Sequence, residues 1–271
     1  MNNYVLQKQI MFSRNIECCR EVIFDLRYLD ITAYTGLAES TMISYDTKAV
    51  SPYITLAKKI ADMYCTNIER LCGDEIYFDI EEILSLQVAF IRRLGGIEIK
   101  SYKEKILAVM DKYLSLSKYE VYKLLSKTFR DIISDLHRDG KYVKIESDEK
   151  IIENFTKNFH DLHAFSKINY RKLGKAIDMS IGNLTRLAQG NEPMLSAVIK
   201  LADFFGVSIT QLLSENPNFD YEKIQKEIEG KTSITNLPSS ISDKKIKKDR
   251  KLRIELLNAS QARKIIEKWL K

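Results

Sequence analysis

The feature that most constrains the fold of this chain is an internal repeat. The segment KLADFFGVSITQLL, at 200–213, corresponds to KIADMYCTNIERLC, at 59–72, with a constant offset of 141 residues. Lys, Ala, Asp, Ile and Leu recur in place, and Pro193 corresponds to Pro52 ahead of each segment. The repeat predicts that one unit, containing a helix, a turn and a capped helix, occurs twice in 271 residues.

The composition favours a helical protein. The chain is 45% hydrophobic and 30% charged, as globular proteins are, and it has only ten Gly and four Pro. We therefore predict a fold that is mainly all-α. The cysteines form no CxxC pair, and we expect them to be small buried hydrophobic residues in a reducing cytoplasm: Cys18, Cys19, Cys65 and Cys72.

The charge is unevenly distributed along the chain. Residues 231–271 carry 12 Lys and Arg against 4 Asp and Glu, a net charge of +8, so the other 230 residues sum to −2. This basic tail could contact polyanions or could be a solvated linker and helix face, and the sequence leaves both readings open. The N-terminus has no apolar signal core and no run approaches the ~18 apolar residues of a membrane span, so we expect a cytoplasmic protein without a membrane partner.

Breaks in the helical patterns suggest four segments. We predict an N-terminal unit, a helical middle domain, a second copy of the unit, and a linker with a basic C-terminal helix, at 1–78, 79–147, 148–217 and 218–271. The middle domain resembles a winged helix, with a short strand at 141–145 and possible DNA-contacting residues Lys127, Arg130, Lys141 and Lys144. The C-terminal helix, at about 244–270, could form a dimer seam or pack on its own chain.

Several local signals predict where helices begin. Ser51-Pro52 is expected to provide a hydroxyl N-cap and the first helical residue, and Pro193 should begin the repeated helix. Ser208-x-x-Gln211 has the form of a capping box. Asn169 is expected to cap the helix that follows it, and Asn67 or Thr66 to cap another.

The segment before the second repeated helix carries a known pattern. INYRKLGKAIDMSIGNLTRLAQGNEP, at 168–193, resembles the helix-turn-helix of the phage-repressor and Cro type, the XRE-like family. In that pattern Leu173-Gly174 lies where the helices cross, Asp178 lies in the turn, and Leu184 and Leu187 anchor the second helix. The N-terminal copy, at 31–52, places its residues similarly: Ile31-Thr32, Gly36, Met42 and Tyr45. Two anchors three residues apart leave the opposite helix face free for a major groove about 12 Å wide.

The resemblance implies two five-helix lambda-repressor-like domains, at about 12–76 and 152–215. It implies a sequence-specific DNA-binding transcription regulator, in particular a repressor of a prophage or mobile island. The partners it implies are double-stranded DNA, a second copy of the chain in a homodimer, and an inducer or antirepressor protein. We see no Ser-Lys autocleavage signature, which favours release by such a partner.

By position in the family pattern, two helices would face the groove. The first offers Ala38, Glu39, Ser40, Thr41 and Ser44, and the second offers Ser180, Ile181, Gly182, Asn183 and Arg186. A guanidinium such as that of Arg186 can pair bidentately with guanine, and Ile181 could meet a thymine methyl group. Phosphate contacts are expected from Tyr170, Arg171 and Lys172, and in the first copy from Arg27 and Lys48.

Two other classes of function fit the sequence less well. The chain could be a protein-interaction module, similar to an antirepressor or antitoxin, that keeps the helical units as a scaffold. An enzyme is not expected, because the chain has no phosphate-binding glycine loop, nucleophile elbow or paired carboxylates. His160 and His163 are three residues apart but lack a second ligand pair, so we predict no metal, cofactor or catalytic residue.

Overall fold

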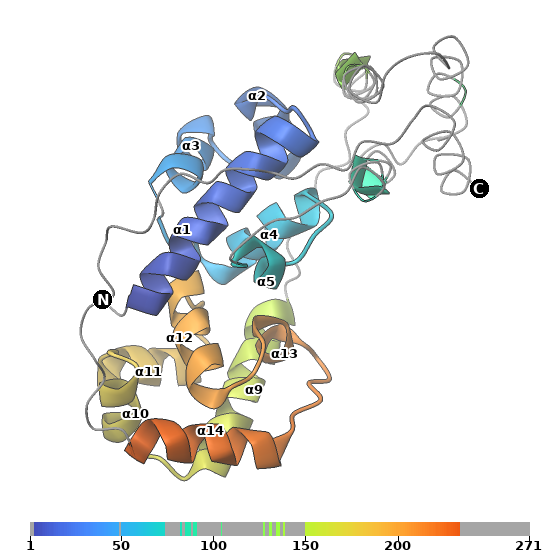
Figure 1. The fold of residues 1–271 in the computed structure, drawn as a ribbon. Helices are drawn as coiled ribbons and strands as arrows, with labels where there is room; N and C mark the ends of the chain where they lie inside the picture. Colours follow the sequence, from blue (N-terminus) through green and yellow to red (C-terminus); the bar gives the residue numbers. More distant parts are fainter. Residues whose placement is uncertain are drawn as a thin grey trace.

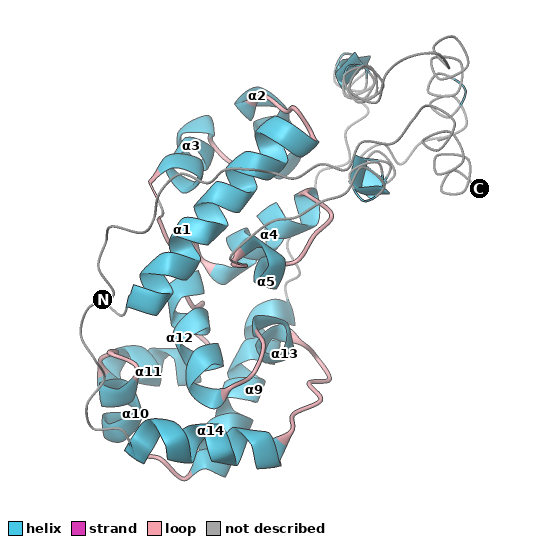
Figure 2. Ribbon diagram, viewed as in Figure 1, coloured by secondary structure: helices cyan, strands magenta, loops and turns pink. Residues whose placement is uncertain are grey.

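The computed structural model describes two long stretches of the chain, shown as a ribbon in Figures 1 and 2. The described residues are 3–48, 50–73 and 150–233, with Glu82, 85–87, 89–90 and a few single positions between 104 and 138. This part is mostly helical and contains no named strand, which confirms the predicted helical class. The predicted strand at 141–145 and the helix at 244–270 lie outside the described residues.

The helices fall into two groups, which we call the first half (3–73) and the second half (150–233). The first half contains α1 (Asn3–Cys18), a π-helix η1 (Cys19–Ile23), α2 (Tyr28–Thr35), α3 (Glu39–Thr47), α4 (Ile54–Met63) and α5 (Ile68–Leu71). The second half contains α9 (Lys150–Ser166), α10 (Tyr170–Ala176), α11 (Ile181–Ala188), α12 (Leu195–Phe205), α13 (Ile209–Leu213) and α14 (Tyr221–Ser233). The halves meet through α4 and α5 of the first half and α12 and α13 of the second half, which lie in the middle of the view in Figure 1.

The two halves match beyond the segments found in the sequence. Three left-handed backbone positions recur in corresponding turns: Asp25 with Lys167, Gly36 with Asp178, and Cys65 with Gly206. The offset between corresponding residues is 142 in the first two pairs and 141 in the third. Between α1 and α9 the offset is 143, so the first half has one extra residue before Asp25. The π-helix η1 accommodates this residue, because a π-helical turn absorbs a one-residue insertion within a helix.

A buried asparagine in each half shows the 143-residue correspondence. The Asn15 side chain donates to the Leu71 carbonyl at 2.8 Å, and the Asn158 side chain donates to the Leu212 carbonyl at 3.0 Å. Both thereby satisfy carbonyls at the end of a short helix, α5 or α13, which would otherwise lack partners. This pair could not be predicted from local spacing, because the donor and its acceptor are more than fifty residues apart.

The expected anchors lie in the core. Ile31, Met42, Leu173 and Leu184 are fully buried and Leu187 is nearly so. Tyr45 is half-buried against the same core.

Gly174 lies where α10 meets α11. A Cβ there would lie 2.5 Å from the Met179 carbonyl oxygen. The close helix crossing of the second half therefore depends on this glycine.

Most of the predicted helix starts are confirmed. The side chains of Asn67, Asn169 and Ser208 each accept the expected backbone N–H, and Gln211 completes the capping box. The prediction for the two proline helices is wrong. The helix α4 begins at Ile54 and α12 at Leu195, two residues later than expected, and their N-cap residues, Tyr53 and Met194, provide no side-chain cap.

The physical reason for this error lies in the tertiary structure. The Ser51 hydroxyl accepts the backbone N–H of Ser196, at 2.9 Å, and so caps α12 in the other half instead of its own helix. Within the described stretches, none of the helices combines the length and apolar character needed to cross a bilayer.

Candidate nucleic-acid interface

The helix α11 turns one face into the core and the other to solvent. Ser180 is its N-cap, with its hydroxyl oxygen accepting the Asn183 N–H at 3.2 Å. Leu184 and Leu187 hold the inner face. The outer face exposes the expected reading residues, Ser180, Ile181, Gly182, Asn183 and Arg186. Ile181 is 48% exposed, so its apolar side chain lies on the same surface as the polar residues of this face.

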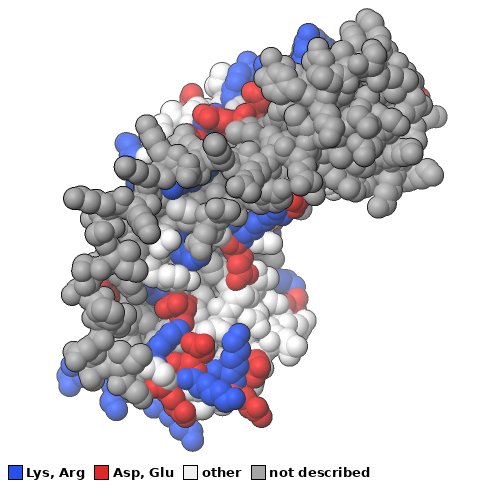
Figure 3. Space-filling model, viewed as in Figure 1, with Lys and Arg blue, Asp and Glu red and all other residues white. Residues whose placement is uncertain are grey.

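Basic side chains surround this face. Arg171 and Lys172 are exposed on α10, as expected for phosphate contacts, and Lys175 is exposed one turn after Arg171. Lys175 was not among the predicted phosphate contacts, although its spacing from Arg171 places both on one side of the helix. Arg171, Lys172, Lys175 and Arg186 form no ion pair within the described residues. In the view of Figure 3, Lys and Arg side chains mark the lower left edge, where α10 lies in Figure 1.

Tyr170 differs from its neighbours because it is half-buried. Its ring lies 4.3 Å from the ring of His163, centroid to centroid, and also packs on Phe159. Burial raises the pKa of its hydroxyl. The structure therefore gives Tyr170 a packing role, in addition to any contact that its hydroxyl could make.

An open groove of about 500 Å³ runs beside the start of α11. Arg171 and Lys175 line it from α10, and Ser180 and Ile181 line it from α11. The chain between the helices closes its floor, and Lys200 steadies that chain by donating to the Asp178 carbonyl at 2.6 Å. The groove joins the basic side of α10 to the exposed face of α11, so one extended ligand could follow both.

The helix α3 presents the corresponding face in the first half. Ala38, Glu39, Ser40 and Lys48 are exposed, whereas Thr41 and Ser44 are half-exposed. The Ser44 hydroxyl donates to the Ser40 carbonyl at 2.9 Å, so it can still accept a hydrogen bond but its donor is used within the helix.

Corresponding positions of the two faces differ in chemistry. At the offset of 142, the pairs are Ala38 with Ser180, Glu39 with Ile181, Ser40 with Gly182, Thr41 with Asn183, and Ser44 with Arg186. The exposed cations of α10 also have no basic counterparts, because Leu29, Asp30 and Ala33 occupy the positions of Arg171, Lys172 and Lys175. Arg27, expected to contact phosphate, is paired with Asp30 at 2.9 Å.

A charged network holds the buried side of α3. The Arg20 guanidinium donates to the Asp46 carboxylate at 2.7 Å, and the Tyr28 hydroxyl donates to the same oxygen at 2.9 Å. Burial raises the pKa of the Asp46 carboxyl, and these two hydrogen bonds offset only part of that effect. Burial, followed by the hydrogen bond to Asp46, raises the pKa of Tyr28 to about 12. The network ties α3 to η1 and α2 and so helps to fix which side of α3 is exposed.

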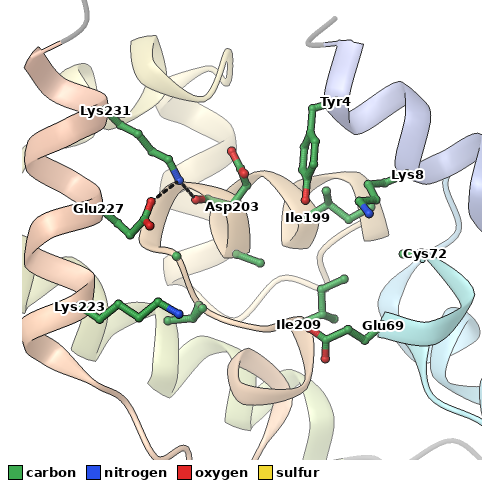
Figure 4. A pocket seen from close by; sticks show the side chains of 13 residues that line it. Tyr4, Lys8, Glu69, Cys72, Ile199, Asp203, Ile209, Lys223, Glu227 and Lys231 are labelled. Carbon is green, nitrogen blue, oxygen red and sulfur yellow. Dashed lines mark hydrogen bonds and ion pairs between the residues drawn. The ribbon is translucent and has the colours of Figure 1, made fainter. Parts of the chain in front are cut away.

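A second cavity, of about 340 Å³, lies where the two halves meet. It is drawn in Figure 4, with Lys231 held by Glu227 and by the Asp203 carbonyl. Its lining contains three lysines and three acidic residues from both halves: Lys8, Lys223, Lys231, Glu69, Asp203 and Glu227. These opposite charges balance, whereas the cations on the exposed face of α10 and α11 form no ion pair within the described residues.

Comparisons of the chain with protein-family models, with curated proteins and with solved structures gave no match. Among the described residues, no group of three or more His, Cys, Asp or Glu side chains converges as a metal site would require. His160 contacts the Ala188 carbonyl at 2.8 Å, and the ring of His163 packs on Tyr170.

Proposed function

We propose that the protein binds double-stranded DNA through the exposed faces of α3 and α11 and regulates transcription, as a repressor of a phage or mobile element. The observation that carries the proposal is the face of α10 and α11. There, the exposed polar and apolar residues of α11 lie next to four cations that form no ion pair within the described residues, and Asp178 lines the same groove as Arg171 and Lys175. Cations position a protein on phosphates, and a neighbouring side chain such as that of Arg186 can then read a base edge.

The two-helix arrangement in each half supports the same proposal. In each half, a short helix is anchored over the core by residues three apart, after a turn with a left-handed residue, Gly36 or Asp178. These are the features by which the sequence resembles helix-turn-helix regulators. We also propose that an inducer or antirepressor protein releases the chain from DNA, and this part of the proposal rests only on that resemblance.

Selection of bound duplexes from a random pool tests the proposal. We expect enrichment of a defined sequence, and Arg186→Ala should lose about 1–3 kcal/mol of discrimination at one base position. Lys226→Ala, an exposed change on α14, is the matched control and should leave the preference unchanged. Retention of random sequences alone would contradict sequence-specific binding.

A second candidate function, a protein-interaction module, is favoured by the first half. Its outer surface exposes Leu29 (57%) and Ile43 (36%) and carries the acidic Glu39. A partly apolar surface that is nearly neutral suits a protein partner better than a phosphate backbone. If the protein ignores duplex DNA at low salt, this second function becomes the better account.

A further inference from the structure

The two halves meet through corresponding residues. Tyr53 pairs with Met194 in an isolated antiparallel bridge, and these residues are 141 apart. The Ile54 N–H donates to the Pro193 carbonyl at 2.9 Å, and the Leu195 N–H donates to the Pro52 carbonyl at 2.8 Å. Such reciprocity, in which each contact is repeated with the partners exchanged, defines the isologous interface of a twofold dimer.

The helix caps are exchanged in the same way. The Thr55 N–H donates to the Glu192 carboxylate at 3.1 Å, and the Ser196 N–H donates to the Ser51 hydroxyl oxygen at 2.9 Å. Thr55 corresponds to Ser196, and Ser51 to Glu192, at the offset of 141. Each half thus caps the first turn of the other half's proline helix, where no local side chain does so.

A second contact between corresponding residues lies further along the interface. The Thr210 hydroxyl donates to the Glu69 carboxylate at 2.9 Å, and these residues are also 141 apart. A residue can touch its own counterpart only near a twofold axis. The two contacts, at Tyr53 and at Glu69, therefore mark an internal axis that passes between α4 and α12 and between α5 and α13.

The axis determines how α3 and α11 are placed. Rotation about an axis preserves height along it, so the two helices lie at the same level, and Figure 1 shows both on the left of the molecule. Five residues separate Thr47 from Tyr53 and Ala188 from Met194. A linker of this length spans at most about 20 Å. The two linkers are joined by the bridge between Tyr53 and Met194, about 5 Å wide, so the ends of α3 and α11 lie within about 45 Å of each other. Half-sites one turn of DNA apart, about 34 Å, fall within this limit.

We infer that one chain is a covalent pseudo-dimer that reads a single DNA target with two inverted half-sites of unequal sequence. This inference rests on the proposed function. The half-sites differ because corresponding reading positions differ, with Glu39 facing one and Ile181 the other, and Ser44 facing one and Arg186 the other. One chain therefore contacts both half-sites, which in a homodimer would require two chains.

The test uses the full chain and the duplex that it selects. We expect one chain per duplex by mass measurement, with Arg186→Ala altering one half-site and Ser44→Ala altering the other. Inserting five base pairs between the half-sites turns one of them to the opposite side of the duplex and should lower the affinity about a hundredfold or more. Inserting ten base pairs should also weaken binding, because the interface fixes the separation of the two helices.

Three results would contradict the pseudo-dimer without contradicting DNA binding. Two chains on a symmetric target, a single half-site, or full recovery with ten inserted base pairs would overturn the inference while leaving DNA binding intact. Absence of binding to any duplex at low salt would overturn the proposed function as well. The double variant Ser51→Ala/Glu192→Ala should relax the spacing requirement, and the control Glu215→Ala, an exposed change, should not.

Discussion

The two halves share one backbone plan but stabilise and use it differently. In the first half, Arg20 lies over the Tyr28 ring, 4.2 Å from its centroid, and binds Asp46. In the second half the corresponding residues are His163, Tyr170 and Ala188, and an aromatic stack replaces the charged network. The outer faces also differ, since the second is basic and the first is nearly neutral. The helical plan therefore depends on the apolar anchors, the turns and the buried asparagines, Asn15 and Asn158, that both halves keep, while the other polar residues around it differ.

The largest effect is expected at Asp46, whose side chain is fully buried. Asp46→Ala removes the buried partner of Arg20 and leaves only the half-exposed Glu21 to pair with its guanidinium, so the change should cost about 3 kcal/mol of folding stability. Unfolding in denaturant measures this loss of folding free energy. The double variant Arg20→His/Asp46→Ala, which copies the second half, should recover much of the loss. If the double variant is no more stable than the single one, the two halves are not interchangeable at this network.

The next effect concerns the helix crossing of the second half. Gly174→Ala places a methyl group against the Met179 carbonyl oxygen and should cost about 1–3 kcal/mol. Gly182→Ala is the matched control, because a Cβ there meets nothing within 4 Å, and it should be neutral or stabilise by up to about 1 kcal/mol. Equal behaviour of the two variants in thermal unfolding would contradict the role given to Gly174.

A smaller effect is expected where the halves cap each other. Ser51→Ala and Glu192→Ala should each cost about 0.5–2 kcal/mol, as loss of an N-cap does. Because each residue caps a helix in the other half, each variant should increase hydrogen exchange at the start of that other helix. Increased exchange confined to the half that carries the substitution would argue against the exchanged caps.

The smallest effect concerns pH. Burial lowers the pKa of His163 below 6.5, and the neighbouring His160 lowers it further, against the backbone hydrogen bond at Ile168. The unfolded chain therefore binds a proton more readily, so this contribution to stability is complete above pH 6.5 and is lost as the pH falls below that value. Melting temperatures at pH 7.5 and 5.5 should differ more for the wild type than for His163→Gln. An equal difference in both proteins would exclude this role.

The sequence predicted most of what depends on neighbouring residues. The caps at Asn67 and Asn169, the box at Ser208 and the buried anchors all follow from local spacing, because their partners lie within one or two helical turns. What it missed depends on residues far apart. Asn15 reaches Leu71, and Ser51 caps a helix 145 residues away, since the donors that it satisfies belong to the other half.

The candidate site shows the same division. The exposure of Arg186 and Ile181 follows from the anchors on the opposite face of α11, so it could be predicted. The half-burial of Tyr170 could not, because it depends on packing against the preceding helix, whereas the pairing of Arg27 with Asp30, three residues apart, follows from local spacing and was not predicted.

The salt dependence of DNA affinity tests the central claim most directly. With the selected duplex, the logarithm of the association constant should fall linearly with that of the salt concentration, because bound cations release counterions. Removing two phosphate contacts, in Arg171→Ala/Lys172→Ala, should make the slope shallower by about 1.8, and Lys223→Ala/Lys226→Ala on α14 should leave it unchanged. No binding at low salt would contradict the account, as would the same salt dependence for the wild type and both double variants.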